Sequence, residues 1–275
     1  MCASGSEEIK RLKKNSPFGS ARRLIVKIGS ALIVDAETGA IRAQWLETLI
    51  EDVVRFFARG QQVIIVTSGA VAVGSRCFNP QRPMRIAEKQ TAAAIGQVQL
   101  MLAYEEALRR HGFGIGQVLL TRQDLERGQG RVNLWAALQK LLETGTVPVI
   151  NENDATATGE ICFGDNDQLA ARVAQMAGAD LLILLSNVDG LFTEDPRRNP
   201  SARLIAKVGC ITPEIELMAS SSADHHSSGG MVTKLMAARI AMDAGCSMII
   251  ANGTKFHPLA AIENGGRWTR FVPLA

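Results

Sequence analysis

Short aliphatic runs alternate along the chain with longer segments in which apolar residues recur every three or four positions. Residues 180–186, DLLILLS, lack any polar alternation, which is typical of a strand buried on both faces of a sheet. Residues 43–60 instead show helical spacing that ends at Gly60. These two patterns predict strands at 23–34 (interrupted by Gly29-Ser30), 61–67, 113–120, 146–150, 180–186 and 246–251, and helices at 43–60, 68–75, 86–110, 131–145, 166–177 and 231–245.

Strands that alternate with helices predict βαβ units, in which each helix carries the chain back to begin a parallel strand. We therefore expect the α/β class, with an open, mostly parallel sheet and helices on both faces (an αβα sandwich). The length of 275 residues suits one large domain of this kind, and an apolar fraction of 47% supplies a sizeable aliphatic core. We expect that domain to cover residues 22–275.

Positive charge is concentrated near the amino terminus. Residues 1–23 hold six basic and two acidic residues, and the whole chain has a net charge of +3, so the remainder is close to neutral. This distribution predicts a flexible, solvated tail over residues 1–21 and no basic face for nucleic acid. The five cysteines show no C-x-x-C spacing and no apolar run approaches the length of a membrane span, so we expect a cytoplasmic protein without zinc or disulfides.

Polar residues and glycines gather where the expected strands end. The densest group is residues 151–172, NENDATATGEICFGDNDQLAAR, which holds five carboxylates and three asparagines between a strand and a helix. Ligands of open α/β sheets bind beyond the carboxyl ends of the strands, so groups that are distant in sequence share one edge. The groups expected at this edge are Lys27, Gly29 and Ser30, residues 67–70 and 151–172, Ser186, Asn187, Asp189 and Gly190, and residues 227–234.

Three of these segments have the composition of a phosphate site. The glycines of KIGS (27–30) and TSGA (67–70) let backbone N–H groups approach an anion, and the second segment begins a helix. The segment SSGGMVTK (227–234) repeats this arrangement and adds Lys234 to Lys27. Two lysines and several backbone donors that converge on one point are what a transferred phosphoryl group needs. A β-bulge at Gly29 and a simple helix cap at Gly230 are the structural alternatives, and the P-loop pattern G-x-x-x-x-G-K-[ST] is absent.

Six motifs follow one another from about residue 22 onward: VKIGSALI, IIVTSGAVAVG, VPVINENDATAT, FGDNDQLAARVA, LLLSNVDGLFTEDPR and GGMVTKLMAA. Together they resemble the glutamate 5-kinases, a family within the amino acid kinase superfamily. The resemblance implies the amino acid kinase fold, with an N-terminal lobe for glutamate and a C-terminal lobe for ATP. It also implies transfer of the γ-phosphoryl group of ATP, supplied with Mg²⁺, to the side-chain carboxylate of L-glutamate, which gives glutamyl 5-phosphate for proline biosynthesis.

The resemblance further implies roles for individual residues. Lys27 would contact the transferred phosphoryl group from the glutamate side and Lys234 from the nucleotide side, while Asp167 would hold both lysines as a structural carboxylate. No protein-held metal is expected, because Mg²⁺ would arrive with ATP. The substrate-binding residues would be Ser68, Gly69, Asp154, Asp165 and Asn166. The ATP-binding residues would be Gly29, Ser30, Ser186, Asn187, Ser228, Gly229, Gly230, Met231, Val232, Thr233 and Lys234.

A site of this kind accounts for the mixture of charges in residues 151–172. The α-ammonium of glutamate requires an anionic partner such as Asp154, and two converging lysines require a carboxylate such as Asp167 between them. Side-chain amides would read the α-carboxylate by hydrogen bonds without adding charge. For Glu152 and Glu160, a solvated acidic loop is the alternative interpretation.

Some positions depart from the family pattern. Asn187 stands where the family usually has Asp, and Ser227 replaces a glycine of the family pattern. Both residues lie in segments expected to bind ATP, so these departures concern the affinity for the nucleotide. His225 and His226 are expected to be loop residues, because no other ligand stands at metal spacing. Many members of the family carry a C-terminal RNA-modification-type (PUA) domain, and we expect this chain to be a short form without it.

Two other functions stay open from the sequence. One is another kinase of the same fold, acting on acetylglutamate or a nucleoside monophosphate, and the other is a non-catalytic nucleotide-binding regulatory subunit. Asp154 favours glutamate, because N-acetylation removes the ammonium that it would pair with. The resemblance also implies a homodimer or homotetramer with proline as a feedback inhibitor. Helix 86–110 is apolar on several sides, which fits either self-association or burial within one chain.

Overall fold

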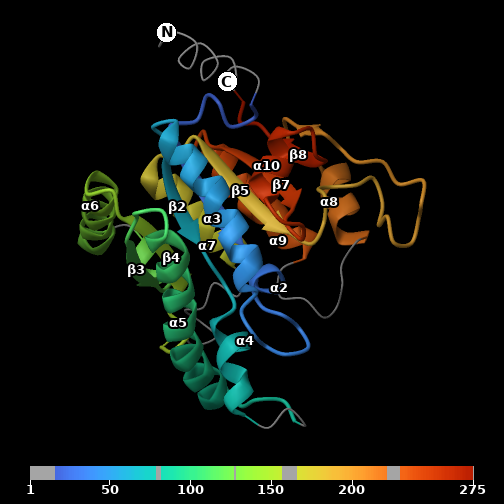
Figure 1. The fold of residues 1–275 in the computed structure, drawn as a ribbon. Helices are drawn as coiled ribbons and strands as arrows, with labels where there is room; N and C mark the ends of the chain where they lie inside the picture. The colour runs from blue at the N-terminus through green and yellow to red at the C-terminus, as the bar shows by residue number, and fades with distance from the viewer. Residues whose placement is uncertain (1–15, 79–81, 127, 157–165, 222–229, 275) are drawn as a thin grey trace.

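The computed structural model describes residues 16–78, 82–126, 128–156, 166–221 and 230–274. In this part of the chain one eight-stranded sheet forms the centre of the molecule, and helices cover it (Figure 1). All hydrogen-bonded neighbours run parallel except β7 and β8, which are antiparallel. The expected open, mostly parallel sheet is confirmed. The strand order is β3 (Ile115–Leu120), β4 (Val147–Glu152), β2 (Gln62–Val66), β1 (Arg23–Ile28), β5 (Leu181–Ser186), β7 (Ser247–Asn252), β8 (Trp268–Phe271) and β6 (Lys207–Val208).

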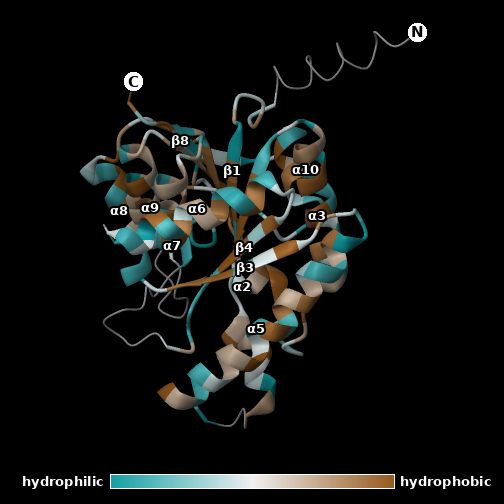
Figure 2. Cartoon of the chain, turned by 90° about the vertical axis from the view of Figure 1, so that its left-hand side faces the viewer, coloured by the Kyte–Doolittle hydropathy of each residue, from teal (hydrophilic) through white to brown (hydrophobic). Residues whose placement is uncertain are grey.

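The two faces of the sheet carry separate hydrophobic cores. In β1, Leu24, Val26 and Ile28 belong to one core and Ile25 to the other, as the two-residue period of a strand requires. The first core includes residues of α3 (Ala43–Ala58), α5 (Ile86–Arg109) and α10 (Pro258–Glu263). The second includes residues of α6 (Gln129–Glu143), α7 (Asn166–Ala177), α8 (Pro213–Ser221) and α9 (Met231–Asp243). Figure 2 shows the apolar strands enclosed between these two helical layers.

Most predicted elements form with bounds shifted by a few residues, but the first strand is shorter than expected. β1 ends at Ile28, and the residues after Gly29 form the one-turn helix α2 (Ser30–Ile33) instead of a continued strand. The run SALI is too short to show either period, so its apolar character does not separate strand from helix. β6, β8, α8 and α10 also have no counterpart among the predicted elements, and of these β6, β8 and α10 are again too short to show a period.

The packed part of the chain begins before residue 22. Phe18 is fully buried in the first core and stacks edge-on against Phe56 with ring centroids 5.2 Å apart. Gln61 Nε2 donates to the carbonyl oxygens of Phe18 and Ala21 at 2.9 and 2.6 Å. Residues 16–21 are therefore part of the folded domain, and the expected flexible tail does not extend through them.

Helices α4 (Ala70–Gly74) and α5 reach together beyond the end of the sheet (Figure 1). Glycines allow their backbones to touch. A Cβ on Gly96 would lie 1.9 Å from the Ala70 carbonyl oxygen, and one on Gly74 would lie 1.8 Å from the Ala92 carbonyl oxygen. No side chain fits at either position, so α5 fixes where α4 begins.

None of the described helices combines the length and apolarity that crossing a bilayer requires.

Candidate active site

Two lysines and one aspartate from three elements meet beyond the carboxyl ends of the central strands. Lys27 is the penultimate residue of β1, Asp167 lies in the first turn of α7, and Lys234 lies near the start of α9. Asp167 Oδ1 lies 2.5 Å from Lys27 Nζ, and Asp167 Oδ2 accepts a hydrogen bond from Lys234 Nζ at 3.0 Å. The alternation of β1 brings this about, because Lys27 shares a face with Ile25, which packs in the core of α7 and α9.

This lysine–aspartate–lysine cluster is buried. Asp167 is fully enclosed, and Lys27 and Lys234 are only 6% and 4% exposed. Burial by itself would raise the pKa of Asp167, but the charges and hydrogen bonds of Lys27 and Lys234 outweigh it and hold that pKa below its ordinary value. Asp167 therefore stays ionised at neutral pH, and the cluster keeps an excess of positive charge. Such a cluster can stabilise an anion that enters from the edge of the sheet.

Side-chain amides form a second group at the ends of β2 and β4. Asn151 lies in β4 and donates from Nδ2 to Gln97 Oε1 on α5 at 2.9 Å. Asn166, the first residue of α7, lies next to the lysine cluster in sequence and joins the two groups. Its Nδ2 lies within hydrogen-bond distance of the Thr67 carbonyl oxygen (2.7 Å), Ser68 Oγ (2.9 Å) and Asn151 Oδ1 (2.8 Å). The predicted residues Ser68 and Asn166 are thus in direct contact.

Gly69 turns the chain from β2 into α4 with a φ of 101°, in the left-handed region that favours glycine. A Cβ on Gly69 would meet Val34 Cγ2 at 2.9 Å and Ser30 Cα at 3.7 Å, so the starts of α2 and α4 lie side by side. Gly29 N donates to the Leu185 carbonyl oxygen of β5 at 3.4 Å. Gly29 and Ser30 therefore stand between the Ser68 side of the site and the β5 side.

Asp154 lies just beyond β4 and is half-buried. Burial, with a smaller contribution from the neighbouring charge of Glu152, raises the pKa of Asp154 to about 6. Glu152 is only 6% exposed, so the alternative of a solvated loop is wrong for this residue. Two neighbouring carboxylates with restricted access to water are suited to a cationic group of a ligand. Glu160 lies outside the described residues.

The other half of the site follows β5 and precedes α9. Ser186 ends β5, and its Oγ lies 3.4 Å from Asn187 Oδ1. Gly230 stands directly before α9, and Thr233 Oγ1 donates to the Gly230 carbonyl oxygen at 2.8 Å. Backbone N–H groups at the start of this thirteen-residue helix favour an anion near Lys234. Met231 is buried there and Val232 is exposed. Asp165, Ser228 and Gly229, with His225, His226 and Ser227, lie outside the described residues.

Two residues that contact this site have no role among the sequence predictions. Gln97 and Tyr104 are buried on the inner side of α5, and Tyr104 OH donates to Thr67 Oγ1 at 3.0 Å. A polar residue inside a long helix usually faces water, so no signal in the sequence separates these two from surface residues. Asn151 does have a signal, because it begins the polar stretch after an apolar strand.

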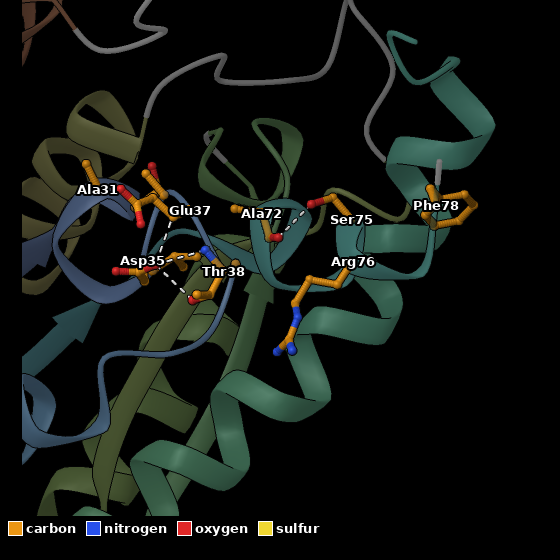
Figure 3. A pocket seen from close by; sticks show the side chains of 12 residues that line it. Ala31, Asp35, Glu37, Thr38, Ala72, Ser75, Arg76 and Phe78 are labelled. Atoms are coloured by element: carbon orange, nitrogen blue, oxygen red, sulfur yellow. Dashed lines mark hydrogen bonds between the residues drawn. The ribbon is translucent and has the colours of Figure 1, made fainter. Parts of the chain in front are cut away.

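A cavity of about 620 Å³ opens between the loop after α2 and the end of α4 (Figure 3). Its lining includes Ser30 but neither lysine of the cluster. Thr38 donates through N and Oγ1 to Asp35 Oδ1 at 2.9 and 2.8 Å, which folds the loop, and Glu37 and Arg76 are exposed. The buried lysine–aspartate–lysine cluster, rather than this cavity, has the charge that group transfer requires.

The sequence of the chain is similar to those of known proteins. The sequence profile of the amino acid kinase family matches residues 22–252. Glutamate 5-kinase 2 of Mesorhizobium japonicum is 70% identical over 257 residues, which are 93% of this chain and 90% of that protein. Glutamate 5-kinase 2 of Rhizobium meliloti is 55% identical over 94% of this chain and 96% of its own length. The glutamate 5-kinase of Paramagnetospirillum magneticum is also 55% identical, but this chain covers only 70% of it.

Solved structures share the fold at much lower identity. The carbamate kinase of Giardia lamblia bound to AMP-PNP superposes with a TM-score of 0.64 at 13% identity, covering 93% of this chain and 99% of its own. UMP kinase of Ureaplasma parvum gives a TM-score of 0.63 at 16% identity, covering 91% of this chain and 98% of its own. The chain belongs to the amino acid kinase family and, within it, to the glutamate 5-kinases.

Proposed function

We propose that the chain transfers the γ-phosphoryl group of ATP to the side-chain carboxylate of L-glutamate, giving glutamyl 5-phosphate and ADP, the first step of proline biosynthesis. The names of relatives that are 70% and 55% identical over nearly their whole length support this activity. The structural observation that carries the proposal is the buried contact of Lys27 and Lys234 with Asp167. A non-catalytic regulatory subunit has no need to keep two buried ammonium groups at one point.

In this reaction a carboxylate oxygen of glutamate attacks the γ-phosphorus, and the bond from that phosphorus to the β–γ bridging oxygen breaks. The electron pair of the broken bond leaves with ADP. Glutamate is already a carboxylate at neutral pH, so no general base has to remove a proton. Catalysis then depends on position and on stabilisation of negative charge, which Lys27 and Lys234 supply from the two sides. Asp167 acts as a positioning residue, because it contacts both lysines and fixes their separation.

On the acceptor side, Ser68, Gly69, Asp154 and Asn166 are proposed to bind glutamate. The charge of Asp154 favours a substrate with a free α-ammonium, which glutamate has and acetylglutamate lacks. Substrate binding would bring a positive charge to Asp154 and lower its raised pKa again. Asp165 is proposed for the same side on the resemblance alone, since it lies outside the described residues.

On the donor side, we propose that Gly29, Ser30, Ser186, Asn187 and residues 228–234 bind ATP. Among the described residues no group of three or more carboxylate, histidine or cysteine side chains is placed to hold a metal ion. Asp167 is already committed to two lysines. Mg²⁺ is therefore proposed to enter with the phosphates of ATP, which it would orient and partly neutralise.

The lobes and partners follow from the same proposal. The half of the chain that contains Ser68 would bind glutamate, and the half that contains Lys234 would bind ATP. We propose proline as a feedback inhibitor, a homodimer or homotetramer as the assembly, and the cytoplasm as the compartment. Val98 and Leu102 stand four residues apart on one side of α5 and are 61% and 64% exposed, which favours a partner on that side of the helix.

The test is a glutamate-dependent acyl-phosphate assay with hydroxylamine, ATP and Mg²⁺, run beside acetylglutamate, aspartate and UMP. Acyl hydroxamate should form with glutamate far faster than with acetylglutamate or aspartate. For UMP, which yields no acyl phosphate, ADP release is measured instead. A higher kcat/KM for any of the three other substrates would refute the assignment.

A further inference from the structure

Gln97 lies on the inner side of α5 and is 7% exposed. Its Oε1 accepts from Asn151, but its Nε2 is buried and has no hydrogen-bond partner among the described residues. A buried side-chain donor without a partner is uncommon in native proteins, because burial removes its water without replacement. A hydrophobic residue would fill the same space without that cost. The presence of an amide side chain at position 97, with Oε1 paired and Nε2 unpaired, therefore needs an explanation.

The Thr67 carbonyl determines how the neighbouring amides are oriented. A backbone carbonyl can only accept, so the atom of Asn166 that faces it at 2.7 Å must be Nδ2. This Nδ2 also faces Asn151, which must present Oδ1 to it at 2.8 Å. Asn151 then has Nδ2 on its other side, and Gln97 must present Oε1 to it. The unpaired Nε2 of Gln97 is the end of this chain of amides.

The same chain leaves two atoms at its other end available to a ligand. Ser68 Oγ lies 2.9 Å from Asn166 Nδ2, a nitrogen that cannot accept a hydrogen bond, so the Ser68 hydroxyl hydrogen can be donated elsewhere. No donor among the described residues reaches Asn166 Oδ1, which is left as an acceptor. The Ser68 hydroxyl can donate to a carboxylate, and Asn166 Oδ1 can accept from an ammonium. An α-amino acid carries both a carboxylate and an ammonium.

Helix α5 is held against residues 67–70 at two further points. Gly96, the residue before Gln97, packs on the Ala70 carbonyl so closely that a Cβ would lie 1.9 Å from it. Tyr104 OH donates to Thr67 Oγ1 at 3.0 Å. Gln97 is therefore fixed relative to Ser68 through the backbone as well as through the amides, which makes it able to transmit orientation.

We propose that Gln97 is a positioning residue for the amino acid substrate. Through Asn151 it reinforces the orientation of Asn166 that the Thr67 carbonyl favours, so that Ser68 donates to a substrate carboxylate and Asn166 Oδ1 accepts from its ammonium. This inference rests on the proposed function, since it assigns Ser68 and Asn166 to the glutamate side. It also changes the expectation that the amides read the α-carboxylate, because here the Asn166 amide offers an oxygen and only Ser68 offers a donor.

Gln97→Met tests the proposal, because methionine has nearly the same length and volume but offers Asn151 only a weakly accepting thioether sulfur in place of Oε1. The KM for glutamate should rise about tenfold or more, as expected for one lost buried hydrogen bond, while the KM for ATP stays within about twofold. Gln99→Met is the matched control, because Gln99 makes the same change on the exposed side of the same helix. A variant that raises both KM values equally, or that matches the control, overturns the proposal.

Asn151→Ala separates action through Asn151 from a direct effect of Gln97. In the Asn151→Ala background, Gln97→Met should change the glutamate KM by less than about twofold, because the path is already broken. Independent, multiplying effects would show that Gln97 acts by another route. If Gln97→Met does not fold, Gln97→Asn gives the same comparison, since it keeps an amide but lacks the reach to Asn151. The parent protein is assayed first: no turnover of glutamate would refute both proposals, whereas normal turnover with an unaffected Gln97→Met refutes only this one.

Discussion

Asp167→Asn is the change that most directly tests the charge arrangement of the site. The substitution keeps the shape of the side chain but leaves Lys27 and Lys234 buried without their shared anion. Neutralising one partner of a buried ion pair costs about 3–5 kcal/mol of stability. One lysine can relieve the repulsion by losing its proton, and this loss becomes easier as the pH rises.

The loss of stability in Asp167→Asn should therefore depend on pH. At pH 9.5 the difference in unfolding free energy between Asp167→Asn and the parent should be smaller than at pH 7.5. In acid, the titrating group is Asp167 of the parent. Its lowered pKa stabilises the parent at pH values above the ordinary carboxyl range, and this stability is lost as the pH falls through the folded-state pKa of Asp167. The variant has no such acid loss.

Urea unfolding of both proteins at pH 7.5 and 9.5 measures these differences, and the hydroxamate assay measures kcat. Asp52→Asn is the control, because Asp52 is also fully buried but accepts from the backbone N–H groups of Leu259 and Ala260 at 2.8 and 2.9 Å, away from the site. It should lose stability at both pH values and keep its kcat, whereas Asp167→Asn should lose about 10²–10³ in kcat. A loss below about 1 kcal/mol at pH 7.5, or one that does not shrink at pH 9.5, would refute the reasoning.

Four further outcomes are expected. Lys234→Ala should lower kcat by about 10²–10³ with a normal circular dichroism spectrum; a kcat within a few-fold of the parent would exclude its role. Asp154→Asn should raise the KM for glutamate but not for ATP, and equal changes would assign Asp154 to loop structure. Burial raises the pKa of Asp154 to about 6, so its contribution to stability is lost as the pH rises from about 4 to 6. In urea titrations at pH 7, Asp154→Asn should therefore be more stable than the parent. The glutamate KM of the parent should rise below pH 6, where Asp154 becomes protonated. Proline inhibition should be relieved by raising glutamate, and persistence at saturating glutamate would place proline elsewhere. Light scattering at micromolar concentration should give at least a dimer mass, whereas a monomer mass would leave the apolar side of α5 unexplained.

The class of fold and most element positions follow from local sequence patterns. The run at 180–186 becomes β5, and residues 166–177 form α7 with the predicted bounds. Each pattern repeats over several consecutive residues, so neighbours in sequence suffice to identify it. Where the run is too short, as in α2 and β8, the local pattern is ambiguous and packing decides.

The candidate site divides in the same way. Glycines and polar residues after apolar strands indicated Lys27, Ser68, Asp167 and Lys234, because the carboxyl ends of parallel strands share an edge. The shared carboxylate Asp167 was expected from the resemblance and from the repulsion of two converging lysines. That these lysines are almost fully buried is not visible in the sequence, where Lys27 is a single charge in an aliphatic strand. Their separation is set by the packing of α7 and α9 on one face of β1, which joins residues far apart in the chain.

Gln97 marks the limit of what the sequence alone determines. The periodicity of residues 86–110 determines a helix, but the inward direction of Gln97 depends on how closely α5 approaches α4. Gly74 and Gly96 make that approach possible, and each matters only because the other helix supplies a backbone at the same point. Local periodicity thus determined the secondary structure and the edge at which ligands bind, whereas the orientation of the amides was decided only by tertiary contact, because a hydrogen bond needs both partners in place.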